Sequence, residues 1–361
     1  MLDIVALASS YLRAYGLVES DKPFDLLYIL AALTQYHIKS CDKYQLILES
    51  TGLLSRSKNF LSTIEDLPFI HVSAFKNSLL ASCEPQYIYK ILSSSGTSGE
   101  KSKIVLSKEN AKLQVIALSS IVTDFMGVAR PTMVVLDKSS TILNTSTYSA
   151  RKAAIVGFGQ ICRRHYFVLD EEFVFQSEIL ERILNETTGK LLFFGFTHIV
   201  WKVINNSSLS TTQKSELANR AIFLHGGGWK KLESQRVSKS QFNLAVKNSL
   251  GIVDIRNYYG MVEQTGTIFM ECKYGNLHDN DLSTVVPRST KDLSSLGLNI
   301  PGIAQVLSSL PTSYPGHSLL TDDLIEVIGE NSCKCGRMGK TFRVLGRLSS
   351  SIPRGCSDAY K

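Results

Sequence analysis

A serine- and glycine-rich stretch has the composition of a loop that binds phosphate. It reads SSSGTSGEKSK from Ser93 to Lys103. Small residues let backbone N–H groups approach an anion, hydroxyls add hydrogen-bond donors, and Lys101 and Lys103 add positive charge. The stretch does not match the Walker A pattern. Because surface loops often have the same composition, the stretch taken alone fits both a phosphate site and an ordinary loop.

Four residues in the second half of the chain are of the types that bind zinc. Cys272 and His278 are spaced Cys-x5-His, and Cys333 and Cys335 are spaced Cys-x-Cys. Structural zinc sites use thiolate sulfur and imidazole nitrogen as ligands. The set therefore indicates either a structural zinc site or reduced cysteines among the turns of a β-rich region.

One cysteine lies close to the end of the sequence, in the segment GRLSSSIPRGCSDAYK. Because this segment is rich in Ser, Pro and Gly, it is not expected to form a core of its own. Cys356 is then either an incidental thiol or a reactive group on a movable arm. A free thiol is mostly protonated at neutral pH, and the nearby Arg354 favours the nucleophilic thiolate.

Alternating strands and helices must position these residues. Residues 1–65 are predicted to be mostly helical, with apolar residues at helical spacing after Asp21. From about residue 88, apolar strands alternate with amphipathic helices, and Ser107 is a candidate cap for one of them. The predicted strands are YIYKIL, PTMVVLD, KLLFFGF, RAIFLHGGG and IVDIRNYYG, and further predicted helices are FQSEILERILNE and SQFNLAVKNSLG. This order predicts α/β layers with a largely parallel sheet.

The motifs fall where such a fold binds ligands. Open α/β sheets bind ligands beyond the carboxyl ends of their strands, and the serine-rich loop, the glycines of LHGGG and the segment NYYGMVEQ each follow a predicted strand. We therefore expect them to form one site. The predicted domain covers 1–345, with a helical part at 1–87, an α/β core at 88–270 and a β-rich subdomain at 271–345. Residues 346–361 are predicted to be a hinge and a mobile tail.

The serine-rich loop resembles the first signature of adenylate-forming enzymes. The matching residues are Ser94, Ser95, Gly96, Thr97, Ser98 and Gly99. The family's next Pro and Lys align with Lys101 and Ser102, so the signature departs from the family pattern there. The resemblance implies that the loop binds ATP and acyl-AMP.

Two further segments resemble the pocket motifs of the same enzymes. The turn formed by Gly226, Gly227 and Gly228 resembles the glycine turn that lines the adenine and carboxylate pocket. The segment NYYGMVEQ resembles the Tyr-Gly-x-Thr-Glu motif. This implies that Tyr259 stacks on adenine and that Gly260 belongs to the same binding site.

The remaining motifs supply charged groups. By the same resemblance, Glu263 holds Mg²⁺, a cation that prefers oxygen ligands, whereas Val262 replaces the family's Thr. The segment LLTDDLIEV implies that Asp323 binds the ribose hydroxyls. The segment VLGRLSSS resembles the hinge of these enzymes and implies that Arg347 reaches ribose or phosphate.

A narrower resemblance covers most of the chain after residue 90. The segments LHGGGWKK, YGMVEQTG, SYPGHSLLTDDL, CKCGRMGK and RGCSD are similar to those of the LuxE-like acyl-protein synthetases of bacterial fatty-acid reductase systems. The implied fold is the large N-terminal domain of adenylate-forming enzymes, with layered α/β subdomains and a smaller β-rich subdomain, without the usual C-terminal domain. In the related phenylacetate–CoA ligases a Cys/His set similar to the one above binds zinc.

This resemblance implies an ATP-dependent acid–thiol ligase. A carboxylic acid, expected to be a fatty acid, would be activated to acyl-AMP with ATP and Mg²⁺. The acyl group would then move to Cys356 as a thioester, for delivery to a partner acyl reductase. Cys356 and Glu263 are thus the candidate catalytic residues. The alternatives are a ligase that passes the acyl group to CoA or a carrier-protein thiol, and a nucleotide-binding scaffold without chemistry.

The composition restricts the class of protein. Hydrophobic residues make up 44% and charged residues 20% of the chain, as in globular proteins. Seven cysteines, mostly scattered, indicate reduced thiols and a cytoplasmic protein. The net charge of +7 is dispersed, which disfavours nucleic-acid binding. The sequence has no apolar run of the ~18 residues that a membrane span needs.

Overall fold

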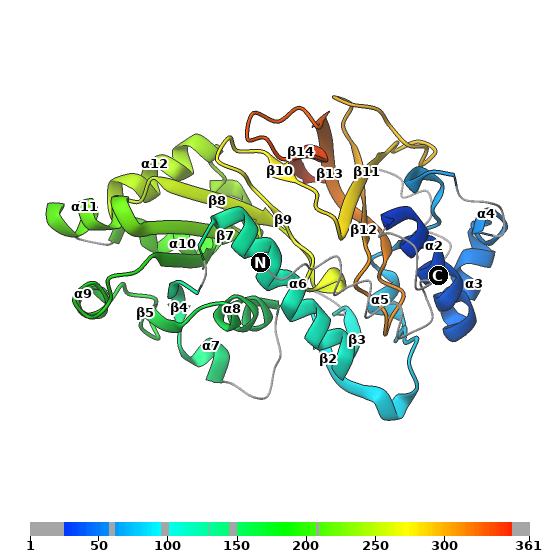
Figure 1. Cartoon of the computed structure of the whole chain (residues 1–361), viewed down its shortest axis with the longest axis horizontal. Helices are drawn as coiled ribbons and strands as arrows, with labels where there is room; N and C mark the ends of the chain where they lie inside the picture. The colour runs from blue at the N-terminus through cyan, green and yellow to red at the C-terminus, as the bar shows by residue number, and fades with distance from the viewer. Residues whose placement is uncertain are drawn as a thin grey trace. The chain divides into compact units, whose positions relative to one another are not determined.

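The computed structural model describes residues 25–57, 62–94, 101–128, 130–143, 150–206 and 209–348 (Figure 1). By its internal contacts the chain divides into two compact units. Unit 1 comprises Met1–Ser120, Met261–Phe269 and Asn276–Lys361, and unit 2 comprises Ile121–Gly260 and Met270–Gly275.

Unit 2 is built on a parallel sheet in the order β5-β4-β6-β7-β8, with β9 (Phe269–Met270) at the edge. Its strands are β4 (Thr132–Lys138), β5 (Arg164–Leu169), β6 (Leu191–Phe196), β7 (Ala221–Gly226) and β8 (Asp254–Tyr259). Its helices are α7 (Ser140–Leu143), α8 (Ala150–Gln160), α9 (Ser177–Glu186), α10 (Thr197–Val203), α11 (Thr211–Arg220) and α12 (Lys239–Leu250), with 3-10 turns η3 (Ile204–Asn206) and η4 (Lys230–Gln235).

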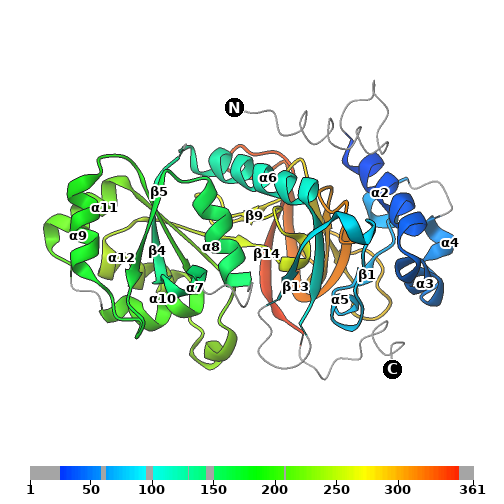
Figure 2. The ribbon, with the colours of Figure 1, turned by 90° about the horizontal axis from the view of Figure 1, so that it is seen from below.

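Both faces of this sheet are covered, and Figure 2 shows α8 on one side of its strands and α9, α11 and α12 on the other. Neighbouring residues of a strand point to opposite faces. The Phe194 ring contacts Phe158 of α8 at a centroid distance of 4.6 Å, while Phe193 stacks on Phe223. The β6 and β7 strands are buried along their whole length, which explains why their sequences are continuous apolar runs.

The strand order of unit 2 reverses beside its first strand. The chain passes from β4 to β5 on one side and then returns to β6 on the other side of β4. The carboxyl ends of β4 and β6 therefore flank a topological switch point, where open α/β sheets bind ligands. This confirms the predicted α/β layers with a largely parallel sheet.

Unit 1 is built on a mainly antiparallel sheet. The order is β10-β14-β13-β12-β11, and β1 pairs with β13 in parallel. The strands are β1 (Ile70–His71), β10 (Leu277–His278), β11 (Ser283–Arg288), β12 (Gly302–Ser308), β13 (Ser318–Glu330) and β14 (Lys340–Arg347). A separate hairpin joins β2 (Ile88–Ser93) to β3 (Lys103–Ser107), and the serine-rich loop connects these two strands.

Unit 1 also contains helices, the first of which, α2, packs against its sheet. They are α2 (Leu26–Ser40), α3 (Asp42–Ser50), α4 (Leu54–Ser57) and α5 (Ala74–Asn77), followed by α6 (Lys108–Met126); 3-10 turns are η1 (Ile64–Asp66), η2 (Pro85–Tyr87) and η5 (Val262–Gln264). Leu30 of α2 forms a buried cluster with Leu67, Val286 and Leu307. Asp25 caps α2 by accepting hydrogen bonds from Leu27 N and Tyr28 N.

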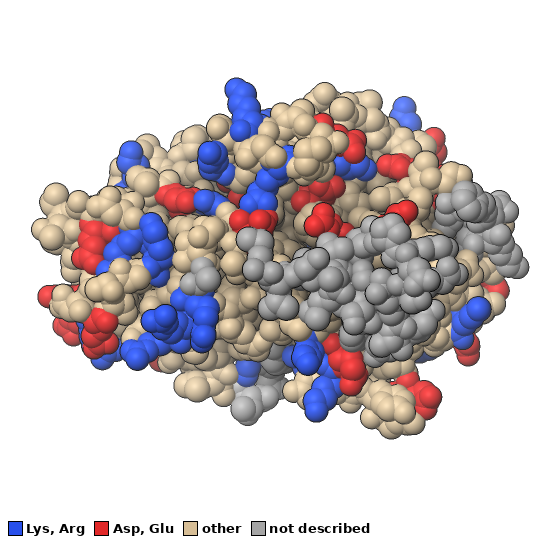
Figure 3. All heavy atoms as spheres, in the orientation of Figure 1, with Lys and Arg blue, Asp and Glu red and all other residues tan. Residues whose placement is uncertain are grey.

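Acidic and basic side chains are interspersed on the face of the molecule drawn in Figure 3. Among the residues that the structure describes, no helix combines the length and apolar character needed to cross a bilayer.

Candidate active site

The glycine turn of unit 2 follows β7 at the carboxyl edge of the parallel sheet. Gly227 and Gly228 have φ values of 80° and 64°, a region that favours glycine. A Cβ atom at Gly226 would lie 2.5 Å from Tyr258 Cε1, and one at Gly227 would lie 2.5 Å from Phe196 Cδ1. The turn therefore requires glycine for its backbone conformation and for the close approach of two aromatic rings.

His225 supports this turn from inside the unit. The Thr197 hydroxyl donates to Gly226 O at 3.1 Å and lies 3.0 Å from His225 Nδ1. Because that hydroxyl has one proton, the imidazole Nδ1–H is the donor toward Thr197. Burial, with a smaller contribution from Lys239, lowers the pKa of His225 to about 3. His225 is consequently a neutral residue that fixes the turn.

Tyr259 lies at the same edge of the sheet as the glycine turn. It is the last residue of β8, and its neighbour Tyr258 is in register with Gly226 of β7. Tyr259 is half-buried and Gly260 is exposed. The sheet thus places the glycine turn and Tyr259 together, while their roles as adenine contacts stay predictions.

The base of the serine-rich loop is fixed in unit 1 by two serines. Ser94 N donates to Ser102 O at 3.1 Å, and Ser102 N donates to Ser94 Oγ at 3.0 Å. This reciprocal pair extends the β2–β3 hairpin by one step. The other predicted residues of the loop, Ser95, Gly96, Thr97, Ser98 and Gly99, lie outside the described residues.

Glu263 is buried in the η5 turn, close to the base of that loop. Burial raises the pKa of Glu263, and Ser102, Lys76 and Arg347 oppose this effect. The Ser102 hydroxyl lies close enough to affect the carboxylate but is not in hydrogen-bonding geometry with any described residue. The structure therefore brings the predicted acid and the base of the predicted phosphate loop into one part of unit 1.

The segment SYPGHS completes the surroundings of Glu263. A Cβ atom at Gly316 would lie 2.8 Å from Glu263 O, and Gln264 Nε2 donates to Gly316 O at 2.8 Å. The Tyr314 hydroxyl and Gln264 Oε1 are buried without hydrogen-bond partners in the described part of the chain. The charge of Glu263 adds to burial in raising the pKa of Tyr314. Sequence inspection missed Tyr314, although its segment is one of those that carry the family resemblance.

Asp323 and Arg347 face each other across neighbouring strands. They are directly paired in register on β13 and β14, and Arg347 Nε donates to Asp323 Oδ1 at 2.9 Å. The Arg347 side chain is 79% exposed, whereas that of Asp323 is 14% exposed. Because the arginine of this pair is largely exposed, the pair contributes little to stability, and the Arg347 side chain is accessible to a polar ligand.

The four predicted zinc ligands are brought together. One ligand atom from each of Cys272, His278, Cys333 and Cys335 lies within 4.8 Å of the others. Cys335 Sγ is 3.4 Å from His278 Nε2, and burial lowers the pKa of this imidazole. Three thiols and one imidazole gathered in this way form a donor set that fits zinc.

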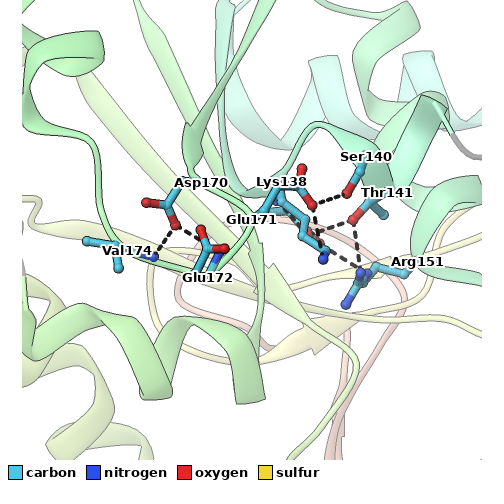
Figure 4. A network of polar contacts seen from close by, with 9 residues as sticks. Lys138, Ser140, Thr141, Arg151, Asp170, Glu171, Glu172 and Val174 are labelled. Carbon is cyan, nitrogen blue, oxygen red and sulfur yellow. Dashed lines mark hydrogen bonds and ion pairs between the residues drawn. The ribbon is translucent and has the colours of Figure 1, made fainter.

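A polar network that the sequence analysis did not identify lies at the carboxyl end of β4 (Figure 4). Arg151 Nε is 3.2 Å from Asp137 Oδ2, and Thr141 donates to Asp137 Oδ1 at 2.8 Å. Lys138 Nζ is 3.2 Å from Glu171 Oε2. A polar residue directly after the apolar run TMVVL was the available signal, because it marks the end of a buried strand.

The predicted nucleophile Cys356 lies outside the described residues.

Comparison with known proteins assigns the family. Over residues 10–361 the sequence matches the profile of the family described as "Acyl-protein synthetase, LuxE". The chain belongs to the LuxE acyl-protein synthetase family. This confirms the resemblance stated from the sequence motifs. No curated protein is detectably similar to the chain in sequence.

Solved structures confirm the fold class. An open conformation of 2-hydroxyisobutyryl-CoA ligase, in complex with 2-HIB-AMP and CoA, is 12% identical with a TM-score of 0.68, covering 89% of this chain and 74% of that chain. The same ligase in its postadenylation state is 12% identical with a TM-score of 0.67, covering 90% and 67%. This member of the LuxE family therefore has the α/β fold of adenylate-forming enzymes.

Proposed function

We propose that this chain activates a fatty acid to acyl-AMP with ATP and Mg²⁺ and transfers the acyl group to its own Cys356. The thioester would be delivered to a partner acyl reductase. The carrying observation is the LuxE family match over residues 10–361, which includes the serine-rich loop, Glu263 and the terminal cysteine. A carboxylate is a poor electrophile, and positioning and charge neutralisation are the main tasks of an enzyme that activates it.

The polar atoms near Glu263 support a magnesium site. Mg²⁺ prefers oxygen ligands and is usually held by one or two carboxylates together with substrate phosphates. The Ser102 and Tyr314 hydroxyls beside the carboxylate have no hydrogen-bond partners among the described residues. In this proposal Glu263 holds the ion, and Asp323 and Arg347 bind the ribose end of ATP. The loop residues 94–99, the glycine turn 226–228, Tyr259 and Gly260 bind the remainder of the nucleotide.

A pyrophosphate-release screen across carboxylic acids tests the activation step. The purified protein, ATP and Mg²⁺ are incubated with acids of increasing chain length. Release that depends on a long-chain acid is the expected result. If no acid stimulates release, the adenylation proposal is wrong and a nucleotide-binding scaffold becomes the better account.

Acyl labelling tests the transfer step. With a radioactive fatty acid and ATP, we expect hydroxylamine-labile label on the wild-type chain and none on Cys356→Ser, although acyl-AMP still forms. Cys83→Ser is the matched control, because Cys83 is a free, half-buried cysteine outside the proposed site, and it should label normally. Label that persists on Cys356→Ser contradicts the assignment.

We propose a structural zinc ion for the Cys272, His278, Cys333 and Cys335 set. The support is the gathering of four soft or borderline ligand atoms within 4.8 Å. Elemental analysis should find stoichiometric zinc in the wild-type protein and a loss in Cys333→Ser. Cys162→Ser, a buried cysteine outside the set, is the control. A wild-type protein without zinc contradicts this proposal.

The likeness to a CoA ligase favours one alternative. In this account the acyl group passes to CoA or to a carrier-protein thiol, and Cys356 takes no part. The labelling experiment distinguishes the two functions when it is run without any added thiol. Acyl label that appears on the chain supports self-acylation, whereas turnover only after CoA is added supports the alternative.

A further inference from the structure

A serine, a histidine and an aspartate form a connected set in unit 1. Ser73 Oγ lies 2.7 Å from His71 Nδ1, and His71 Nε2 lies 3.4 Å from Asp322 Oδ1. The histidine ends β1, the aspartate lies on β13, and the pairing of these strands places His71 opposite Leu320. The sheet therefore fixes the distance between the histidine and the acid.

The backbone of Ser73 determines which ring nitrogen of His71 carries the proton. Ser73 N donates to His71 Nδ1 at 3.2 Å, and a backbone N–H can only donate. Nδ1 is therefore the acceptor, and in the neutral ring the proton is on Nε2, which faces Asp322. The Ser73 hydroxyl shares the Nδ1 lone pair as a second donor, at the shorter distance. Serine, imidazole and carboxylate thus stand in the order of an activated nucleophile, and proton transfer to Nδ1 requires the longer N–H contact to open.

The set is partly exposed and lies next in sequence to residues of the candidate active site. His71 and Asp322 side chains are 10% and 26% exposed, and Ser73 is half-buried. Asp322 precedes Asp323, the proposed ribose ligand. Ser73 precedes α5, whose Lys76 acts on the Glu263 carboxyl.

We propose that Ser73, His71 and Asp322 form a second acyl-transfer site, which hydrolyses an activated acyl group carried as a thioester. Ser73 is the nucleophile and His71 the general base, and Asp322 is a positioning residue that holds the imidazole in the required tautomer. This activity would remove acyl groups that the adenylation site has loaded. The identity of the substrate rests on the proposed function.

The chemistry balances with water as the only co-reactant. Ser73 Oγ attacks the carbonyl carbon, its proton passes to His71 Nδ1, the carbon–sulfur bond breaks, and the leaving thiolate takes that proton. Water then attacks the seryl ester and gives a proton to His71. The bond between the acyl carbon and Oγ breaks, Ser73 regains its proton from His71, and a carboxylic acid is released.

The start of the terminal segment supports a thioester on this same chain as the substrate. Leu348 N donates to the backbone oxygen of Asp322 at 2.9 Å. Cys356 is eight positions after Leu348, a contour length of at most about 29 Å. A thioester on Cys356 would thus be tethered to the residue that orients His71.

Labelling with an alkyl fluorophosphonate tests the site in the absence of ATP and of a carboxylic acid substrate, and it does not depend on Cys356. The Ser73 oxygen would attack phosphorus with loss of fluoride, and peptide mass spectrometry would locate the adduct. We expect label on Ser73 in the full-length protein, none at that peptide in Ser73→Ala, and labelling on the order of 100-fold slower in Asp322→Asn. Asp322→Glu should recover part of the rate, as expected for an acid that orients the imidazole.

Ser82→Ala is the matched control, since Ser82 also lies 2.7 Å from a histidine Nδ1 but is buried. The Ser82→Ala variant should label like the wild type. An unchanged thermal melting temperature of Ser73→Ala should show that the Ser73→Ala variant is folded. Wild-type protein that does not label at Ser73, or Asp322→Asn that labels at the wild-type rate, overturns the proposal. Acid-dependent pyrophosphate release from the same preparation reports separately on adenylation, so failure of one does not imply failure of the other.

Discussion

Two serine–histidine pairs of unit 1 have the same contact distance and opposite surroundings. Ser82 Oγ lies 2.7 Å from His37 Nδ1, and Ser73 Oγ lies 2.7 Å from His71 Nδ1. In the first pair the other ring nitrogen faces the carbonyl oxygen of Pro311 at 3.1 Å. In the second it faces the carboxylate of Asp322. Both arrangements fix the same tautomer, but only the second places an acid beside the ring, as in a catalytic triad.

Burial separates the two pairs further. His37 is fully buried, and its ring stacks on His317 at 5.0 Å and meets Tyr44 edge-on. Burial lowers the pKa of His37 to about 3, so the ring remains neutral at neutral pH. The pair at His37 therefore connects α2 to the loop that carries Pro311, whereas the pair at His71 is partly exposed to solvent. A serine–histidine pair at this distance is thus a candidate for catalysis only where an acid lies beside the imidazole and the pair is exposed.

The largest expected effect is a loss of stability in acid caused by the buried pair. His37 has a folded pKa of about 3, below its unfolded value of roughly 6.5. Its contribution is present above the unfolded pKa and decreases as the pH falls toward 3, because only the unfolded chain takes up the proton. The slope is about 1.4 kcal/mol per pH unit. His37→Gln should reduce the slope of unfolding free energy against pH by one proton.

Tyr36→Phe is the control for this prediction. It removes the hydrogen bond from the Tyr36 hydroxyl to Ser82 O without removing a group that titrates in acid. It should lower the unfolding free energy equally across this pH range. An acid slope that is the same in His37→Gln and in the wild type would show that His37 is not the group responsible.

The next largest effect separates the two histidines by reactivity. His71→Asn should slow fluorophosphonate labelling at Ser73 by on the order of 100-fold, because the general base is lost. His37→Asn should leave the labelling rate unchanged while lowering the unfolding free energy. Rates come from quenched time courses and stabilities from urea titrations. Equal labelling by both variants would remove the functional distinction between the pairs.

The element order of unit 2 was predictable because its strands are apolar along their whole length. The sequence runs TMVVLD and LLFFGF became β4 and β6, and the helix predicted after Ser107 begins at Lys108, with Asn110 N donating to Ser107 Oγ at 3.1 Å. The end of α9 was less predictable. The helix ends at Glu186 with Thr187 in an extended conformation, although the nearest following glycine is Gly189. The position of a glycine alone does not show at which residue a helix ends.

The candidate site was predictable where a motif is contiguous and not where long-range pairing forms it. Gly226 to Gly228 and Glu263 stand in recognisable local sequences. In contrast, Ser73 and His71 are separated from Asp322 by about 250 positions in the printed sequence. They meet only because β1 pairs in parallel with β13. Tyr314 is a similar case. Its position beside Glu263 results from the packing of the fold and cannot be recognised from the spacing of residues in the sequence.

The smallest expected effect compares the two serines by stability. Ser82→Ala removes the hydroxyl that donates to a buried imidazole nitrogen, and leaving such an atom unsatisfied costs about 1–3 kcal/mol. Ser73→Ala acts at a half-buried position, where water can replace the lost donor, so we expect a change within about 0.5 kcal/mol. Urea titration at neutral pH measures both. If Ser73→Ala destabilises the chain as much as Ser82→Ala does, the hydroxyl of Ser73 is held for stability, and the contrast between a structural pair and a reactive pair no longer stands.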